Sequence, residues 1–204
     1  MSEYNPVDNV GVVVLAAGSS SRLGQPKQLI KYKGKPLLQN ILDHSQVLSF
    51  TSKVLILGAH AEEIKKNINT GEFRVIINEQ WEEGIASSIL KGVRSSLEIN
   101  PNLENILFLL SDQPFVTSAL IKELLDTHKK EGKTITGCRY DKTVGVPVIF
   151  NKNMFRELCH LNGDRGAKVL IRKYPDKVAA VSFDLGSVDI DEPEDYRKLL
   201  KLKD

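Results

Sequence analysis

The stretch Leu15-Ala16-Ala17-Gly18-Ser19-Ser20-Ser21-Arg22-Leu23-Gly24-Gln25-Pro26-Lys27 directly follows the apolar run Val10-Gly11-Val12-Val13-Val14. This pattern predicts a buried strand that runs into an anion-binding loop. Small residues and two glycines let backbone N–H groups approach a phosphate closely. Arg22 and Lys27 add two positive charges, so the sequence indicates a nucleoside triphosphate as the ligand.

Two common phosphate-binding loops do not fit this stretch. A Walker loop needs G-x-x-x-x-G-K-[ST], whereas Gly24 is followed by Gln25 and the lysine comes three residues after the glycine. The dinucleotide fingerprint needs G-x-G-x-x-G, and Gly18 is followed by serines. Neither class of loop is therefore predicted.

The composition indicates one α/β domain over residues 1–204. The chain has 204 residues, of which 41% are hydrophobic, and it contains no linker rich in Pro, Gly or Ser. Its 28 basic and 26 acidic residues give a net charge of +2, which provides no case for a nucleic-acid or membrane surface. We expect small-molecule partners.

The cysteines and the N-terminus favour a cytoplasmic protein. Cys138 and Cys159 lack C-x-x-C spacing and any histidine pattern that would hold zinc, so free thiols are expected. The N-terminal residues are polar, with no basic segment before an apolar one, and eighteen apolar residues never run together.

Alternating segments predict a doubly wound, mostly parallel sheet, a Rossmann-like arrangement. Strand-like apolar runs occur at residues 10–15, 53–57, 73–77 and 106–110, and helical spacing occurs at 37–47 and 85–97. Continuous rather than alternating hydrophobicity indicates strands covered by helices on both faces. Ligands of such sheets bind at the carboxyl ends of the strands.

After Asp126 the pattern changes and predicts an antiparallel extension. Residues 134–139 and 145–150 resemble two strands joined by a turn at Asp141-Lys142. Helices are expected at 153–160 and 166–174, a strand at 178–183, and a final helix started by Asp191, Pro193 and Glu194.

Asp112 is the predicted metal ligand. It follows the strand-like run 106–110 in the string Ser111-Asp112-Gln113-Pro114, beside the crevice where the magnesium of a triphosphate needs an oxygen ligand. The alternative role is an N-cap, but Thr117 is better placed to cap the next helix. Oxygen ligands suit both Mg²⁺ and Mn²⁺.

Several nearby lysines are set aside. Lys31, Lys33 and Lys35 alternate with Tyr32 and Gly34, which predicts the exposed side of one short strand rather than phosphate contacts. His60 is interpreted as a residue at a helix start rather than a catalytic one.

The segment Trp81-Glu82-Glu83-Gly84-Ile85-Ala86-Ser87-Ser88 predicts a small-residue helix start. The unpartnered N–H groups of a first turn can receive an anion or a base edge. A serine-rich cap with Trp81 packed in the core is equally consistent with the physics.

Two later segments carry weaker signals. The turn around Arg165 leads into a helix, and this arginine could meet a second anionic group. In Val188-Asp189-Ile190-Asp191, either carboxylate could reach a metal while the other caps the final helix, and capping is the safer role for Asp191.

The first stretch resembles the signature LAAGxSxRxGxPK of nucleotidyltransferases with a single α/β domain, in particular the molybdenum cofactor cytidylyltransferase-like proteins. The likeness extends from Val10 to Tyr196 and includes a W-x-x-G-x-x-S-S segment, which favours Gly84, Ser87 and Ser88 as nucleotide contacts. It implies that Leu15, Ala16, Ala17 and Gly18, continuing into Ser19 and Ser20, hold the nucleotide, while Arg22 and Lys27 hold its phosphates. In this family a second alanine, here Ala17, goes with CTP, whereas LAGG goes with GTP.

The resemblance also implies a reaction, in which a phosphate oxygen of molybdopterin attacks the α-phosphorus of CTP and pyrophosphate leaves. Lys27 would stabilise charge at the α-phosphate, Arg22 would hold the leaving phosphates, and Asp112, with Asp189, would hold Mg²⁺ or Mn²⁺. An ionised phosphate nucleophile needs no general base.

The acceptor side departs from the family pattern. Relatives often have G-H-P where this chain has Gly145-Val146-Pro147, so a polar group near the acceptor is replaced by valine. Gly145, Pro147 and Arg165 are the predicted acceptor contacts. The wider family includes accessory proteins of purine catabolism, which implies a molybdenum hydroxylase of the xanthine dehydrogenase type as a recipient.

Three alternatives stay open. The Pro26-Lys27-Gln28 string also resembles methylerythritol phosphate cytidylyltransferases, which act on another phosphorylated acceptor, although these usually have H-D-A-A-R-P after the central strand. A nucleotide-binding carrier or insertion factor for a molybdenum enzyme is the second. An NADPH-dependent reductase is the third, disfavoured because no acidic residue ends the second strand before Gly58-Ala59-His60.

Overall fold

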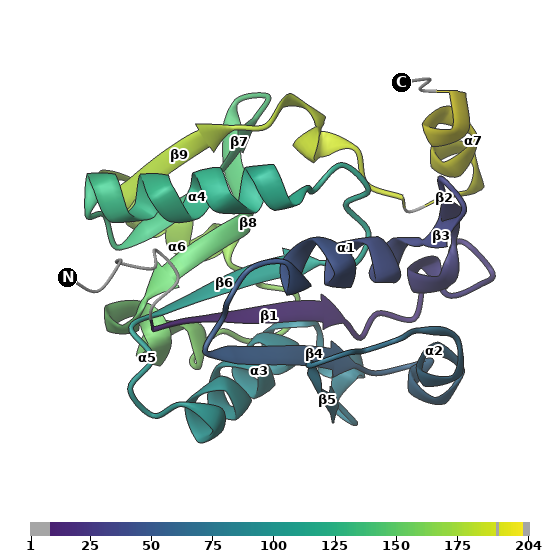
Figure 1. Cartoon of the computed structure of the whole chain (residues 1–204), viewed down its shortest axis with the longest axis horizontal. Helices are drawn as coiled ribbons and strands as arrows, with labels where there is room; N and C mark the ends of the chain where they lie inside the picture. Colours follow the sequence, from purple (N-terminus) through teal and green to yellow (C-terminus); the bar gives the residue numbers. More distant parts are fainter. Residues whose placement is uncertain (1–8, 191, 202–204) are drawn as a thin grey trace.

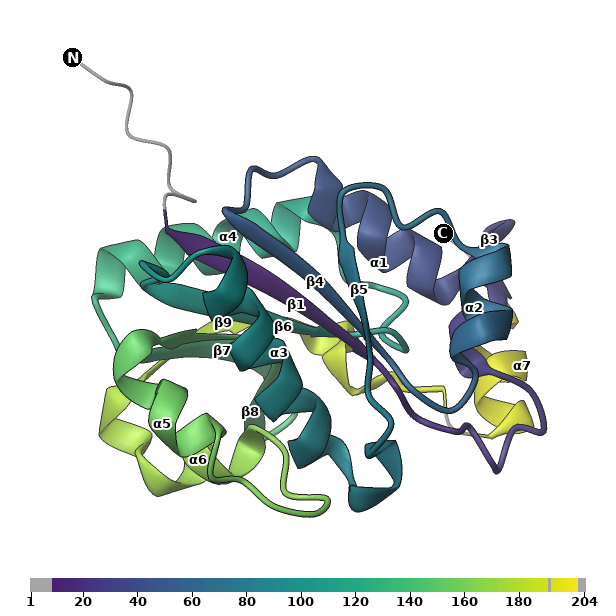
Figure 2. The ribbon, with the colours of Figure 1, turned by 90° about the horizontal axis from the view of Figure 1, so that it is seen from below.

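The computed structural model describes residues 9–190 and 192–201 of the chain. Its main feature is a seven-stranded sheet with the order β5-β4-β1-β6-β8-β7-β9, covered by helices on both faces (Figures 1 and 2). The predicted α/β doubly wound fold is confirmed.

The elements follow one another along the chain as strands, α-helices and short 3₁₀ turns. The strands are β1 (Val10–Ala16), β2 (Lys31–Tyr32), β3 (Lys35–Pro36), β4 (Ser52–Leu57), β5 (Arg74–Ile77), β6 (Asn105–Leu110), β7 (Ile135–Tyr140), β8 (Thr143–Asn151) and β9 (Val178–Ser182). The α-helices are α1 (Leu37–Gln46), α2 (Ala61–Asn67), α3 (Ile85–Ile99), α4 (Ser118–Glu131), α5 (Phe155–Leu158), α6 (Lys168–Lys173) and α7 (Pro193–Lys201). The 3₁₀ turns are η1 (Lys27–Leu29), η2 (Trp81–Glu83), η3 (Lys152–Met154), η4 (Pro175–Lys177) and η5 (Asp184–Ser187).

Strand β1 lies in the middle of the sheet because it is apolar on both faces. All seven of its residues are buried, and it pairs in parallel with β4 on one side and β6 on the other. Val12 and Val14 face the core under α1, α2 and α4, whereas Val13 and Leu15 face the core under α3, α5 and α6. A continuous apolar run therefore predicts a central strand correctly.

The antiparallel part of the sheet is an insertion rather than an edge extension. The β7–β8 hairpin turns at Asp141-Lys142, as expected, but β8 lies between β6 and β7 and is antiparallel to both. Because β9 pairs in parallel with β7, β8 is the one strand of this sheet that runs against the others. The carboxyl ends of β1, β6, β7 and β9 consequently meet at one edge of the sheet.

The expectation of one short strand at Lys31, Lys33 and Lys35 is wrong. The segment folds back as a hairpin of β2 and β3, whose two turn residues, Lys33 and Gly34, have φ of 51° and 82°. A two-residue turn with positive φ at both positions matches the twist of paired strands. The helix predicted at 153–160 is too long, because the structure has only η3 and the four-residue α5 there.

Thr117 caps α4, as predicted, because its side chain accepts a hydrogen bond of 3.2 Å from the Leu120 N–H. Asp112 is thereby left available for another role.

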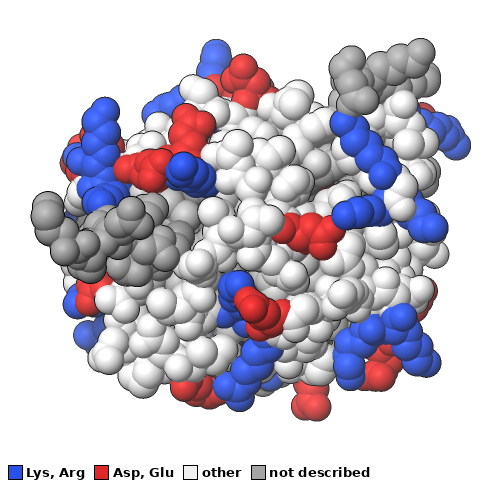
Figure 3. Space-filling view, in the orientation of Figure 1, with Lys and Arg blue, Asp and Glu red and all other residues white. Residues whose placement is uncertain are grey.

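None of the helices in the described ranges combines the length and apolarity that crossing a membrane requires. On the face seen in Figure 3, positive and negative side chains are interspersed.

His128 of α4 is a half-buried histidine that makes the fold sensitive to acid. Its Nδ1 lies 2.8 Å from the Thr136 hydroxyl and its Nε2 lies 2.9 Å from Oδ1 of Asn105, an arrangement that suits a neutral ring. Burial lowers the pKa of His128 to about 4, from 6.5. The folded state therefore excludes a proton that the unfolded state binds below pH 6.5.

We expect the free energy of unfolding to fall as the pH falls from 6.5 to 4, by about 3 kcal/mol from this group. Urea unfolding at a series of pH values measures this dependence, and His128→Asn should flatten it. The matched control His160→Asn removes an exposed histidine and should keep the slope. An unchanged slope in His128→Asn would contradict the assignment.

Candidate functional site

A cavity of about 400 Å³ opens where the adjacent strands β1 and β6 end. Its walls come from the loop after β1, from the loop after β6, from the start of α3 and from the loop before α6. The lining residues are Leu15, Ala16, Ala17, Gly18, Ser19, Lys27, Gln28, Trp81, Glu82, Gly84, Ile85, Ser88, Leu110, Ser111, Asp112 and Asp164. The position agrees with the expected ligand crevice at strand carboxyl ends.

The loop after β1 is held by a buried glutamine. Gln28 is fully buried, and its side-chain amide donates hydrogen bonds to the carbonyls of Ala16 at 2.9 Å and Gly18 at 3.1 Å. Ser20 adopts a positive φ of 55°, and its hydroxyl accepts from the Lys27 N–H at 3.0 Å. These bonds fix the backbone that lines the cavity before any ligand binds.

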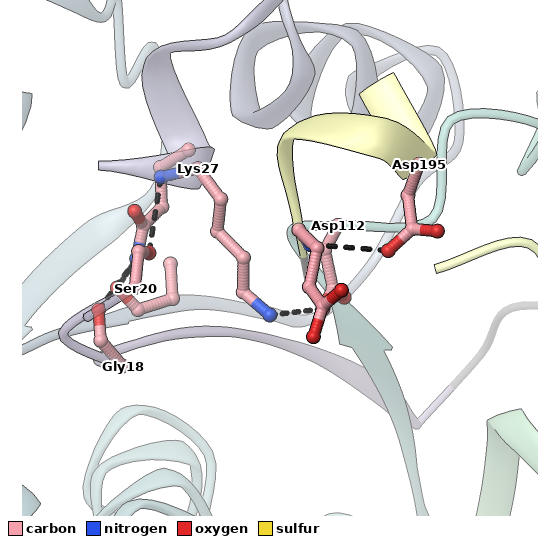
Figure 4. A network of polar contacts seen from close by, with 8 residues as sticks. Gly18, Ser20, Lys27, Asp112 and Asp195 are labelled. Atoms are coloured by element: carbon pink, nitrogen blue, oxygen red, sulfur yellow. Dashed lines mark hydrogen bonds and ion pairs between the residues drawn. The ribbon is translucent and has the colours of Figure 1, made fainter. Parts of the chain in front are cut away.

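Lys27 and Asp112 face each other inside this cavity (Figure 4). Their Nζ and Oδ2 atoms are 2.5 Å apart, and their side chains are only 19% and 11% exposed. A charge pair so far removed from water is much less screened than one on the surface. Lys27 and Asp112 therefore supply the cation and the carboxylate that a metal-bound phosphate needs, and Glu82 and Asp164 add further carboxylates to the cavity lining.

The start of α3 provides a second wall. The side-chain amide of Asn78 donates to the hydroxyls of Ser87 at 2.8 Å and Ser88 at 2.9 Å. The Ala86 N–H donates to the carbonyl of Gly163 at 3.1 Å. One N–H of the first turn is thus paired with a backbone carbonyl, but no side chain in the described part of the chain caps α3, so the expected serine cap is not observed.

Trp81 fulfils both expectations for it, because it packs partly on the core under α3 and also lines the cavity. Next to Trp81, Gly58 allows the backbone segments at Ala17 and Trp81 to approach closely. A Cβ at Gly58 would lie 2.5 Å from the Ala17 carbonyl oxygen and 2.8 Å from the Trp81 Cβ. The ends of β1 and β4 and the turn at η2 thereby come together without a side chain between them.

Gly84 occupies a backbone conformation that only glycine adopts readily, with φ 94° and ψ 176°. A Cβ there would lie 2.4 Å from the carbonyl carbon of Gly163. We expect Gly84→Ala to lower the free energy of unfolding by at least about 2 kcal/mol and to raise the KM for nucleotide, because the loop at Gly163 must move.

Chemical unfolding and steady-state kinetics measure these two effects. The control Gly132→Ala also forces a residue into positive φ, at 59°, but no atom lies within 4 Å of its added Cβ. It should cost about 1 kcal/mol of stability and leave the KM unchanged. Equal behaviour of the two variants would refute the role of the Gly84–Gly163 contact.

The charges of Asp112 and Asp189 both act on one buried phenol, that of Tyr140. Burial first, then the nearby charges of Asp189 and Asp112, raise the pKa of Tyr140 to about 12. Asp189 is exposed, and Asp191 lies outside the described residues. In the described ranges no three His, Cys, Asp or Glu side chains form a metal-binding group, so a metal here would take further oxygens from its ligand and from water.

The comparisons with known proteins agree with this geometry. Residues 12–178 match the family described as the MobA-like NTP transferase domain. The chain belongs to this family. It is therefore a nucleotidyltransferase of the MobA-like type, and the seven-stranded sheet is the fold of that family.

Similar proteins include both a solved structure and named enzymes. The crystal structure of Rv0371c from Mycobacterium tuberculosis superposes with a TM-score of 0.80 at 31% identity, covering 96% of this chain and 99% of that one. Rv0371c has also been solved in complex with manganese, at 30% identity and a TM-score of 0.80, with 95% and 99% covered. Nicotine blue oxidoreductase of Paenarthrobacter nicotinovorans is 29% identical, covering 92% of this chain and 95% of the relative.

A protein of Natranaerobius thermophilus named "probable molybdenum cofactor guanylyltransferase" is 27% identical over 124 residues. That match covers 61% of this chain and 57% of the relative. The names of these relatives belong to different reaction classes. They therefore do not determine which nucleotide and which acceptor this chain uses.

Within this MobA-like domain, most of the predicted nucleotide contacts lie together. Those that line the cavity are Leu15, Ala16, Ala17, Gly18, Ser19, Lys27, Gly84 and Ser88, with Asp112. Ser20 lines a neighbouring cavity of about 440 Å³ between the loop and the start of α2. The Ser87 hydroxyl donates to the carbonyl of Gly84 at 2.8 Å instead of facing the main cavity.

Other predicted residues lie outside the cavity wall. The side chain of Arg22 is 64% exposed and lies 3.9 Å from the Glu192 carboxylate. Arg165 is exposed, next to the lining residue Asp164. Gly145 lies beside the Tyr140 hydroxyl, where a Cβ would be 2.1 Å from its oxygen, and Pro147 is buried after a cis peptide bond.

Some site residues of the MobA-like domain were missed from the sequence. Gln28, Glu82, Ser111 and Asp164 line the cavity, although no site role was predicted for them. Gln28, Glu82 and Ser111 stand within or beside the motifs that carried the predicted contacts. His60 begins α2, as interpreted, and its Nε2 lies 2.9 Å from the Ser19 carbonyl oxygen. It thereby tethers the loop rather than entering the cavity.

Proposed function

We propose that this protein transfers CMP from CTP to the terminal phosphate of molybdopterin and releases pyrophosphate. The observation that carries the proposal is the Lys27–Asp112 pair, 2.5 Å apart and nearly buried in a cavity walled by the loop after β1. In this ion pair each charge neutralises the other. The same two charges would serve a triphosphate and its counter-ion, so both would exchange partners when the nucleotide binds.

The donor set fits a divalent metal that arrives with the nucleotide. One or two protein carboxylates supplemented by phosphate oxygens and water are the usual coordination of Mg²⁺ in such sites. When bound, Mg²⁺ or Mn²⁺ neutralises phosphate charge and orients the leaving group. Asp112 is the residue proposed to hold it, with Asp189 as a second candidate at the same edge of the sheet.

The protein's own groups would act mainly by position and charge. Lys27, released from Asp112, would donate to an α-phosphate oxygen as charge develops there. Gln28 would keep the carbonyls of Ala16 and Gly18 away from the phosphates and the loop backbone fixed. Arg22 would leave Glu192 to reach the β- and γ-phosphates, a movement that its exposure permits.

The acceptor assignment rests on a link between two segments. The side-chain amide of Gln113, the residue after Asp112, donates to the Val146 carbonyl at 3.0 Å. This bond ties the Gly145–Pro147 segment to the loop that carries the proposed metal ligand. An acceptor phosphate held near Gly145, Pro147 and Arg165 would then approach the nucleotide from the β8 side.

The experiment that tests the proposal measures pyrophosphate release from CTP, GTP, ATP and UTP with Mg²⁺, with and without molybdenum-loaded molybdopterin. Release that is specific to CTP and requires the acceptor supports it. Preference for GTP would overturn the cytidine assignment, and release that does not require molybdopterin would overturn the acceptor. Absence of binding by every nucleotide would overturn the nucleotide site.

The likeness to nicotine blue oxidoreductase over nearly the whole chain favours one second candidate, a reduction that uses a nicotinamide cofactor. The loop after β1 lacks G-x-G-x-x-G, and β4 is followed by Gly58-Ala59-His60 rather than by an acidic residue. Oxidation of NADPH, followed at 340 nm in the same preparations, distinguishes this activity from nucleotidyl transfer.

Ala17 supports the choice of cytidine, because in the resembling family a second alanine at this position goes with CTP and because Ala17 lines the cavity. We expect Ala17→Gly to raise kcat/KM for GTP relative to CTP by about tenfold, the effect of one methyl group in a specificity pocket. Ala16→Gly is the matched control, since its methyl group packs in the opposite core and should not affect base preference. An unchanged ratio in Ala17→Gly would show that this methyl group does not select the base.

A further inference from the structure

A second cavity, of about 340 Å³, lies beside α6 and the β7–β8 hairpin. It shares no lining residue with the cavity where β1 and β6 end, which we call the nucleotide cavity after its proposed ligand. Four basic residues line it: Arg139, Lys142, Lys168 and Arg172. They come from three elements, the end of β7, the hairpin turn and α6. We refer to it as the basic cavity.

The charge of the basic cavity is not balanced by the protein. It has no acidic lining residue, and none of its four basic side chains forms an ion pair within the described ranges. Two other lysines behave differently. Lys173, next to Arg172 on α6, pairs with Glu157 at 2.8 Å, and Lys152 pairs with Glu104 at 2.7 Å.

The four charges of the basic cavity differ from the mixed charges on the face shown in Figure 3. On the face shown in Figure 3, positive and negative side chains are interspersed, as expected for a chain with a net charge of +2. The basic cavity lies on the face of the sheet covered by α6, where Figure 2 shows α3, α5 and α6 below the sheet. Four like charges around one hollow repel one another, and an anion there would relieve this repulsion.

The floor of the basic cavity is apolar. Val144 of β8, Val178 at the start of β9 and Ile171 of α6 form part of its lining, and Ile171 is only 7% exposed. A volume in this range suits a small organic ligand rather than a macromolecule. The planar guanidinium groups of Arg139 and Arg172 can bind phosphate oxygens in a bidentate manner.

We propose that the basic cavity is a second binding site, which takes a small phosphorylated compound with an aromatic or other flat apolar body. The phosphate would lie among the four basic side chains, and the apolar body would cover Val144, Ile171 and Val178. This site stands independently of the proposed nucleotidyl transfer, because it uses none of the residues of the nucleotide cavity.

Isothermal titration calorimetry with 1-naphthyl phosphate tests the proposal, with 1-naphthol and inorganic phosphate as comparison probes. 1-Naphthol lacks the phosphate and inorganic phosphate lacks the aromatic body, so each comparison probe should bind at least about tenfold more weakly than 1-naphthyl phosphate. The variants Arg139→Gln/Arg172→Gln and Lys142→Gln/Lys168→Gln should each weaken naphthyl phosphate by about tenfold or more. All four side chains are exposed, so we expect both variants to fold.

Two controls locate the binding. Lys122→Gln removes an exposed lysine of α4, on the opposite face of the sheet, and should not alter affinity. Lys27→Met changes the nucleotide cavity and should also leave naphthyl phosphate binding intact. Loss of binding in Lys27→Met with retention in the arginine variant would overturn the proposal, because the probe would then occupy the nucleotide cavity.

The comparison probes provide the remaining contradicting results. If 1-naphthol bound as tightly as 1-naphthyl phosphate, the four charges would not contribute to binding. If inorganic phosphate bound as tightly as 1-naphthyl phosphate, the apolar floor would not contribute. Absence of naphthyl phosphate binding to the unmodified protein would overturn the site as a whole. Nucleotidyl transfer, assayed in parallel, should be unchanged in the arginine variant.

Discussion

Lys27→Met should lower the rate of nucleotidyl transfer by about 10³-fold, the largest effect we expect from a single substitution in this protein. Lys27 is the cation of the nucleotide cavity that lies within contact distance of the proposed metal ligand, 2.5 Å from Asp112. Methionine keeps the length and apolar stem of the side chain and removes the charge. Single-turnover formation of the CMP ester measures the chemical step directly.

The same substitution should also affect stability, which must be separated from catalysis. Without Lys27, the Asp112 carboxylate, only 11% exposed, loses its charged partner, and the free energy of unfolding should fall by about 1–3 kcal/mol. The double variant Lys27→Met/Asp112→Asn removes both charges. It should recover most of that stability but none of the activity.

Lys31→Met is the matched control for Lys27. Lys31 is an exposed lysine of β2, close in the chain, and does not line the cavity. It should retain full activity and stability. Full transfer activity in Lys27→Met would contradict its role at the α-phosphate.

Asp112→Asn should reduce metal-dependent transfer by about 10²–10³-fold and raise the Mg²⁺ concentration needed for half-maximal rate. The amide keeps the shape of the carboxylate, but it lacks the negative charge that binds a divalent cation. Initial rates measured across a Mg²⁺ titration, and again with Mn²⁺, separate weaker metal binding from a slower chemical step.

Asp126→Asn, which neutralises an exposed carboxylate of α4, is the control and should titrate like the unmodified protein. If Asp112→Asn kept the normal Mg²⁺ dependence, the metal ligand would have to be another carboxylate. Asp189 would then be examined first, because its charge acts on the same phenol, Tyr140, as that of Asp112.

Much of the fold could be predicted because local apolar patterns coincide with the elements that are buried. The runs that became β1, β4 and β6 are continuous, and such strands are covered on both faces. The position of β8 could not be obtained in this way. A hairpin pattern states that two strands pair, but which of them contacts β6 depends on packing across the sheet.

The candidate site shows the same division. Lys27 and Asp112 could be predicted because Asp112 comes just after β6 and Lys27 lies in the polar loop that follows β1. Glu82 and Asp164 reach the cavity only because distant loops fold over it, and Asp164 is positioned by the contact between Gly163 and the start of α3. Gln28 was missed for a different reason, since a polar side chain is normally expected at the surface.

The central position of β1 has a consequence for how the chain folds during synthesis. β1 is translated before every other strand of the sheet, yet one of its edges pairs with β6, starting with Val10 opposite Asn105. At about 5–20 residues per second, that edge stays open for several seconds or longer. An apolar strand with an unpaired edge invites pairing with other chains. Slow translation between β1 and β6 would therefore lengthen the period in which the newborn protein is most prone to aggregate.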